Sequence, residues 1–211
     1  MAKARRHHRS TRELFDQHSL ALEELKAEPR IITAPVVKRL WFSICLPQLP
    51  LVASGPGKSA RGVVEDQHGI HRVLLACPRA AAASVMPGQS ANAALALLPT
   101  LDNVERTELA EQQALENLAC WLERFTSVVC FAGPDVLLVE IYGSLRLYGG
   151  LLNLRQQIAA GLVEQGFTAS LAIAPTPLAA TWLAKGERRT CIREPANIAA
   201  ALRRLPLACL D

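Results

Sequence analysis

The sequence lacks the features that would place a protein in a membrane or in an oxidising compartment. No apolar run in its 211 residues approaches the roughly 18 that a membrane-spanning helix needs. The basic start of the chain has no apolar core of the kind that a signal peptide requires. The six cysteines show no paired spacing and mostly lie inside apolar runs, which indicates reduced, buried thiols. We therefore expect a cytoplasmic protein with no membrane partner.

A strong charge of either sign is also missing. The formal net charge is +4, which permits a polyanionic partner without demonstrating one. Basic residues crowd the first dozen positions, among them Lys3, Arg5 and Arg6. The chain is rich in hydrophobic residues, 50% of the total, and so can bury a core in one domain of moderate size or one and a half.

Apolar runs separated by turn signals predict the strands. In Ser127–Gly150, two β-branched runs flank the turn Gly133-Pro134-Asp135, which is typical of a hairpin with one carboxylate at its tip. The other strands are predicted from mostly apolar segments of suitable length. The predicted strands are Val36–Leu46, Gly62–Asp66, His71–Ala76, Ser127–Ala132, Val136–Ile141 and Phe167–Ala174, with a possible edge strand at Arg189–Arg193.

Helical periodicity and Pro or Gly boundaries predict the helices. The longest candidate has its leucines near one face and its charged residues on the other. A further helix in the basic start has capping-box spacing at Ser10 and Glu13. The predicted helices are about Thr11–Ala27, Pro78–Val85, Gly88–Leu98, Val104–Thr126, about Leu151–Gln165, Pro175–Lys185 and Pro195–Arg204.

This order of elements predicts an α+β fold. Without the lobe at about residues 53–99, the order is βαββαβ, the ferredoxin-like arrangement in which helices cover one face of an antiparallel sheet. The sheet domain would then comprise residues 36–52 and 100–211, preceded by a basic helical arm at 1–35. Because the first strand and the hairpin are neighbours in that topology, the end of the first strand should meet the hairpin tip.

Three segments carry a family resemblance in the right order. The hairpin followed by Gly143-Ser144-Leu145-Arg146-Leu147-Tyr148-Gly149 resembles the palm of Y-family (UmuC/DinB-type) DNA polymerases. Leu171–Ala184 is similar to that family's VGIAPNKxLAKxAS segment, and Val73–Pro99 is similar to its fingers. The resemblance implies a polymerase palm with a fingers insertion. Because the chain ends at Asp211, we expect the thumb and little finger to be absent.

The carboxylates that the family pattern requires are mostly replaced. Two-metal nucleotidyl transfer needs acids from the first strand and from the hairpin, holding ions about 4 Å apart. The resemblance aligns Ser43 and Cys45 with the first-strand aspartates, and Leu40–Leu51 contains no acid. At the hairpin Asp135 is kept, but Val136 occupies the glutamate position. Thr181 stands where the family has its triphosphate-binding lysine.

Other carboxylates of the sequence do not substitute for the missing acids. Glu140 matches a later aspartate of the pattern but stands five residues from Asp135, and on a regular strand it would point to the other face. Glu65 and Asp66 belong to the inserted pair of strands instead of the end of the first strand. We therefore predict neither a metal site nor a cofactor, and interpret Asp135 as a turn residue that caps backbone amides.

A palm without its carboxylates resembles the ImuB group, degenerate Y-family relatives in bacteria, as does Leu46–Leu51 (LPQLPL). The resemblance implies a non-catalytic DNA repair factor in damage-induced (SOS) mutagenic translesion synthesis. It implies a RecA-like accessory protein and an error-prone replicative-type polymerase as partners, with a sliding clamp in doubt because the C-terminal region is absent.

Two alternatives remain open at this point. The first is an active but divergent translesion polymerase, and the second is a truncated palm with a purely structural role. The repair-factor hypothesis predicts weak, sequence-neutral DNA binding through phosphate contacts. The candidate DNA-binding residues are Lys3, Arg5, Arg6, Arg61, Arg72 and Arg79.

Overall fold

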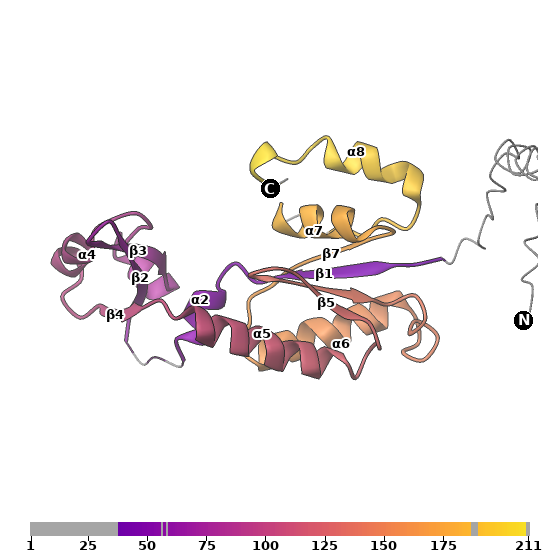
Figure 1. Ribbon diagram of the computed structural model, residues 1–211, viewed down its shortest axis with the longest axis horizontal. Helices are drawn as coiled ribbons and strands as arrows, with labels where there is room; N and C mark the ends of the chain where they lie inside the picture. The colour runs from indigo at the N-terminus through magenta and orange to yellow at the C-terminus, as the bar shows by residue number, and fades with distance from the viewer. Residues whose placement is uncertain (1–37, 56, 58, 187–189, 210–211) are drawn as a thin grey trace, which may run out of the picture. The chain divides into compact units, whose positions relative to one another are not determined.

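The computed structural model describes residues 38–55, 57, 59–186 and 190–209 (Figure 1). The predicted arm at 1–35, with Lys3, Arg5 and Arg6, lies outside the described residues. The chain divides into two units, Met1–Val37 and Lys38–Asp211, and the second contains everything described below.

A four-stranded antiparallel sheet is the centre of this second unit. Its strands are β1 (Trp41–Cys45), β5 (Val129–Gly133), β6 (Val136–Glu140) and β7 (Ser170–Ala174), in the spatial order β5-β6-β1-β7. Helix α5 (Glu108–Leu122) connects the inserted lobe to β5, and α6 (Leu151–Glu164) connects β6 to β7. This is the predicted ferredoxin-like βαββαβ arrangement, and the α+β fold class is confirmed.

Helices cover both faces of this sheet, whereas the order of elements in the sequence predicts helices on one face only (Figure 1). Helices α5 and α6 pack on the face formed by Phe42, Ile44 and their neighbours. On the other face, α7 (Pro177–Lys185) packs against β1 and β7, and α8 (Ile198–Leu202) packs against α7. All five residues of β1 are buried, because helices cover the strand on both faces of the sheet. Four of the five are apolar, as is typical of a strand enclosed on both faces.

The inserted lobe contains a second sheet, with β2 (Arg61–Gln67) between β3 (Ile70–Ala76) and β4 (Asp102–Glu105). The β2–β3 hairpin is the predicted one, and its turn has positive φ at His68 (59°) and Gly69 (80°). Helices α3 (Pro78–Ala82) and α4 (Ala91–Leu97) lie where helices were expected. Short 3-10 turns at Pro195–Asn197 and Leu207–Cys209 and the helix α2 (Leu49–Ala53) complete the elements.

Helices α5 and α6 approach each other closely at one point. Gly161 of α6 faces Trp121 of α5, and a Cβ added at Gly161 would overlap Trp121 Cζ2 and lie 2.7 Å from Cη2. Trp121 packs edge-on against Phe125 with ring centroids 5.1 Å apart, and Tyr148 packs on Phe125 at 5.3 Å. The Tyr148 hydroxyl donates a hydrogen bond to the Arg124 carbonyl. Only glycine fits at this helix crossing without displacing the indole ring.

Among the described helices, none has the length and apolar character needed to span a membrane.

Candidate functional site

The end of β1 and the tip of the β5–β6 hairpin meet, as the sequence analysis expected. Cys45 is paired with Val136, and the Leu46 N–H donates a 2.8 Å hydrogen bond to the Asp135 carbonyl. The Cys45 thiol lies 3.8 Å from Asp135 Oδ2 and donates to it. The backbone therefore brings together the segments that carry the acids of the family pattern.

The side chains at these positions do not fit two divalent ions. Ser43, paired with Leu138, has no exposed surface, and its Oγ has no hydrogen-bond partner among the described residues. Val136 is equally buried and offers no ligand atom. Mg²⁺ and similar hard cations require several oxygen ligands, and a thiol is a soft one. Asp135 supplies the one carboxylate among these four aligned positions, and a single carboxylate cannot by itself hold two divalent ions.

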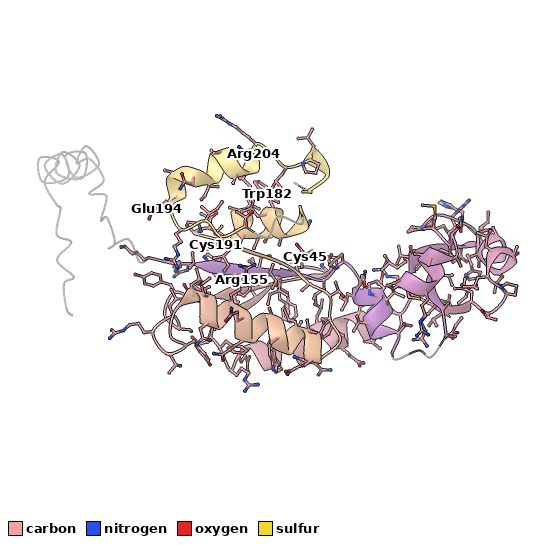
Figure 2. All side chains as sticks on the ribbon, turned by 180° about the vertical axis from the view of Figure 1, so that it is seen from behind. Cys45, Arg155, Trp182, Cys191, Glu194 and Arg204 are labelled. Atoms are coloured by element: carbon pink, nitrogen blue, oxygen red, sulfur yellow. The ribbon has the colours of Figure 1, made fainter. Side chains whose placement is uncertain are left out.

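Helix α7 closes the sheet face on which these residues lie. Ala179, Ala180 and Leu183 pack against Cys45 and Val136 in a continuous apolar core, and Figure 2 shows Cys45 on β1 beneath this helix. Thr181, the position of the family lysine, is 8% exposed. Its hydroxyl donates to the Pro177 carbonyl within α7 at 3.1 Å, so it satisfies the helix backbone.

Glu140 lies at the far end of the strand from Asp135. It pairs with Trp41, and its Oε1 accepts hydrogen bonds from the N–H groups of Leu40 (3.1 Å) and Tyr142 (3.0 Å). Trp41 and Cys45 face α7, so their strand partners Glu140 and Val136 share that face. Asp135 precedes Val136 in the turn, so the prediction of opposite faces, made for a regular strand, does not apply to it. The two carboxylates lie at opposite ends of β6, because Asp135 comes just before the strand and Glu140 is its last residue.

The carboxylates of the inserted lobe are also engaged elsewhere. Glu65 Oε1 lies 2.8 Å from Arg106 Nη1 in an ion pair. Asp66 Oδ1 accepts a 2.7 Å hydrogen bond from the Gly69 N–H and thereby caps the β2–β3 turn. Across the described residues, no group of three or more His, Cys, Asp and Glu side chains is placed to hold a metal ion.

The predicted DNA-binding arginines differ in their surroundings. The Arg61 guanidinium bonds to Asp102 Oδ2 and to the Ser54 and Gly55 carbonyls, and its side chain is 14% exposed, so it anchors the lobe to the end of α2. Arg72 Nη1 donates to the Gly88 carbonyl at 2.9 Å. Arg79 lines an open cavity of about 570 Å³ together with Arg61.

The thiol of Cys77 lies in the same cavity. Although burial alone would raise its pKa, hydrogen bonds from the backbone of Arg61, Ala80 and Arg79, and the positive charge of Arg79, lower the pKa overall. The Arg61 N–H donates to Cys77 Sγ at 3.2 Å. The thiolate is thus favoured at a lower pH than for an ordinary cysteine.

A charge cluster, in which Glu111 is buried and the other two side chains are partly exposed, was not predicted from the sequence and is centred on Arg106. Its guanidinium is held by Glu111 through two hydrogen bonds of 2.8 and 3.0 Å and by Glu65 at 2.8 Å. These bonds to Glu111 and Glu65 raise the pKa of Arg106 above its already high value. The cluster joins β2 of the inserted lobe to α5. The available signal was Glu111 on the apolar face of α5, four residues before Leu115, because an acid on such a face needs a cationic partner.

The fold and this site define a class, the palm of a Y-family DNA polymerase. The structure superposes on the Dbh DNA polymerase in its post-insertion binary complex with a TM-score of 0.63 and 15% identity, covering 82% of this chain and 53% of that one. DinB from Sulfolobus solfataricus gives 0.53 with 14% identity, covering 75% and 49%. At these identities the likeness concerns the fold alone.

Residues 45–185 match the impB/mucB/samB family, and the chain belongs to that family. Protein ImuB of Caulobacter vibrioides, in two strains, is 36% identical over 126 residues. That alignment covers 60% of this chain and 28% of the relative. The chain thus spans less than a third of these curated relatives and about half of the solved polymerases.

Proposed function

We propose that this chain is a non-catalytic, polymerase-like factor in DNA-damage-induced translesion synthesis. The observation that carries the proposal is the filled face of the sheet, where Ser43 and Val136 are buried in an apolar layer beneath α7. A site of that kind cannot admit hydrated divalent ions without rebuilding the core. Membership of the impB/mucB/samB family and the likeness to ImuB support the link to DNA damage.

By its resemblance to the ImuB group, the chain would act through protein partners, namely a RecA-like accessory protein and an error-prone replicative-type polymerase. We propose contacts with DNA that are weak and directed at the phosphates. The site geometry supports the proposal because a polymerase-like fold whose aligned positions lack most of the acids can still serve as a surface for protein contacts.

Primer extension tests the proposal. With a primed template, all four deoxynucleotides and either Mg²⁺ or Mn²⁺, we expect no incorporation above the protein-free control, and the same result for Asp135→Ala. The physical reason is that a lone carboxylate cannot position two ions. Incorporation that Asp135→Ala abolishes would establish the alternative, an active divergent polymerase.

DNA binding should depend on phosphate contacts. We expect the affinity for single-stranded DNA to fall linearly with salt on a log–log scale, with a slope of about −0.7 per phosphate contacted. Arg72→Ala should reduce the magnitude of that slope by about one contact, because this arginine lies on the surface of the inserted lobe. Arg155→Ala on α6 is the matched control. Measurements by fluorescence anisotropy between 50 and 300 mM salt, roughly the range in which counterion release is resolved, would reveal a flat response if phosphate contacts were not involved.

A further inference from the structure

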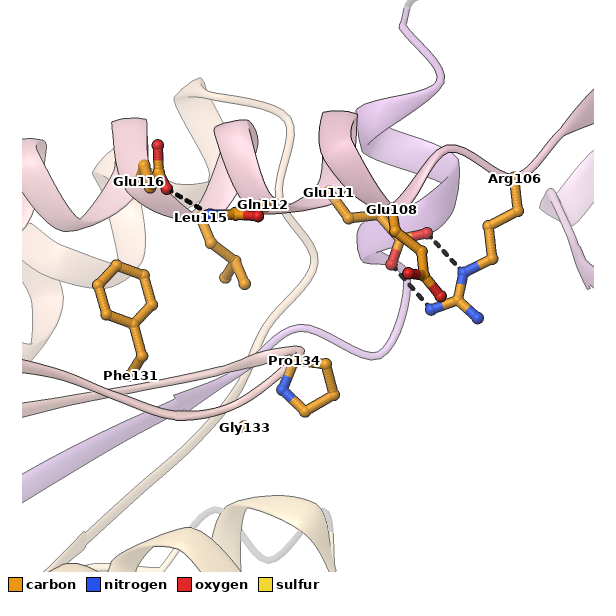
Figure 3. A pocket seen from close by; sticks show the side chains of 9 residues that line it. All are labelled: Arg106, Glu108, Glu111, Gln112, Leu115, Glu116, Phe131, Gly133 and Pro134. Carbon is orange, nitrogen blue, oxygen red and sulfur yellow. Dashed lines mark hydrogen bonds and ion pairs between the residues drawn. The ribbon is translucent and has the colours of Figure 1, made fainter.

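The open edge of the main sheet lies beside a groove that the proposed function does not use. Among the described strands, β5 pairs with β6 only, so its other edge is open. A groove of about 390 Å³ separates this strand from α5 (Figure 3). The groove lies on the α5 side of the sheet, away from the face that α7 covers.

The backbone of β5 presents hydrogen-bonding groups at this edge. The Glu140 N–H donates to the Val128 carbonyl at 3.1 Å. Because inward and outward amides alternate in an antiparallel pair, Val129 and Phe131 direct their N–H and C=O groups away from β6. The pairing register shifts between Phe131 and Gly133, so a strand added here would be short.

Arg106 also lines the groove, but its charge is paired with Glu111 and Glu65, so the remaining carboxylates make the wall opposite β5 negative above an apolar floor. Glu108, Gln112 and Glu116 follow one another at four-residue spacing, which places them on one side of α5. Gln112 Nε2 donates to Glu116 Oε1 at 2.8 Å and fixes that carboxylate over the groove. Figure 3 shows Leu115 and Phe131 pointing toward each other between the helix and the strand. Phe131 is 56% exposed, unusual for a large aromatic side chain in a sheet.

We propose that this edge and groove bind an extended basic segment of a partner protein, which adds to the sheet as a strand beside β5. Glu108 and Glu116 are separated along α5 by a rise of about 12 Å. Residues four apart on an extended chain are separated by about 13 Å and lie on the same face. The segment would therefore carry basic residues at its first and fifth positions and an apolar residue at its third, over Phe131 and Leu115.

The charge of the groove favours a basic peptide segment over nucleic acid or a second copy of this chain. Nucleic acid would bring phosphates to a wall that carries Glu108 and Glu116. A second copy of this chain would bring its own β5, whose sequence VCFAG contains no basic residue to pair with that wall. A basic extended segment satisfies the edge amides, the apolar floor and the carboxylates together.

This inference rests on the proposed function only in that the chain works through protein contacts. The test contains no DNA and no nucleotide, so its failure is separable from the result of primer extension. The probe is a fluorescent blocked peptide of sequence Arg-Thr-Val-Thr-Arg, compared with Glu-Thr-Val-Thr-Glu by fluorescence anisotropy on the full chain. We expect the arginine peptide to bind at least about tenfold more tightly, with an affinity that falls as salt rises.

Two pairs of variants test the two halves of the proposal. The double variant Glu108→Lys/Glu116→Lys should weaken binding about tenfold or more, whereas Glu164→Lys on the exposed surface of α6 should leave it unchanged. Phe131→Pro and Phe131→Val both remove the ring, but only proline removes the outward N–H, so Phe131→Pro should bind more weakly than Phe131→Val. Thermal unfolding checks that each variant is folded.

Four results would overturn the proposal. These are no binding of the arginine peptide at millimolar concentration, equal affinity for the two peptides, an unchanged affinity after charge reversal, and a dimer of the wild-type chain that Phe131→Pro disperses.

Discussion

Replacing Gly161 with alanine is expected to lower the free energy of unfolding by about 1–2 kcal/mol. The added Cβ would overlap Trp121 Cζ2, so either the indole ring or one of the two helices must move. Overpacking of this kind costs about 1–3 kcal/mol, occasionally more, and it outweighs the roughly 1 kcal/mol that alanine gains over glycine in helix propensity. Chemical denaturation followed by circular dichroism measures the difference.

A double variant separates the clash from any other effect at this position. If the clash is the cause, Trp121→Leu/Gly161→Ala should be less destabilised than the sum of the two single variants, because the smaller side chain leaves room for the methyl group. Simple additivity would contradict the explanation. Ala160→Gly on the exposed side of α6 is the control for helix propensity, with an expected cost of about 1 kcal/mol.

Replacing Arg106 with methionine is expected to cost about 3–4 kcal/mol of unfolding free energy. The change leaves the Glu111 carboxylate, 6% exposed, without the cation that holds it through two hydrogen bonds. Removing one partner of a buried ion pair typically costs about 3–5 kcal/mol, because the other charge stays desolvated. The same change also breaks the ion pair with Glu65, so we expect the inserted lobe to become susceptible to limited proteolysis.

Removing both charges should restore most of the lost stability. The double variant Arg106→Met/Glu111→Leu replaces the pair by apolar side chains of similar size, which is often close to neutral. Arg146→Met, at an exposed position, is the control and should change stability by less than about 0.5 kcal/mol. A double variant as unstable as Arg106→Met alone would show that the cost does not arise from the unpaired carboxylate.

The chain's local patterns were enough to predict most of the elements and the sheet topology, but not their ends. The long helix was predicted from Val104, yet it begins at Glu108, because Val104 and Glu105 pair with β2 in a parallel ladder that only the tertiary fold reveals. Helix α2 was missed because Pro47 and Pro50 indicate a turn, although proline is well tolerated in the first turn of a helix.

The sequence predicts that the end of the first strand meets the hairpin tip and that most of the acids of the family pattern are replaced there. It does not predict what covers these residues. The pairing of Cys45 with Val136 follows from topology, which the element order predicts. The position of α7 over that face does not follow from the element order, because small apolar residues such as Ala179 and Ala180 could pack on either face of the sheet. For the Arg106 cluster, Glu111 indicates that a cation is needed, but the sequence does not reveal that Glu65, 41 residues from Arg106, contacts the same guanidinium.

The buried hydroxyl of Ser43 bears on the evolutionary reversibility of this site. A carboxylate introduced there, or at Val136, would enter a dry apolar layer with no cation beside it, and an isolated buried charge of this kind is strongly disfavoured. The first acid introduced would be buried and unpaired until the second acid and a metal ion were also present. Introducing a two-metal centre into this core would therefore require the packing beneath α7 to be rebuilt first.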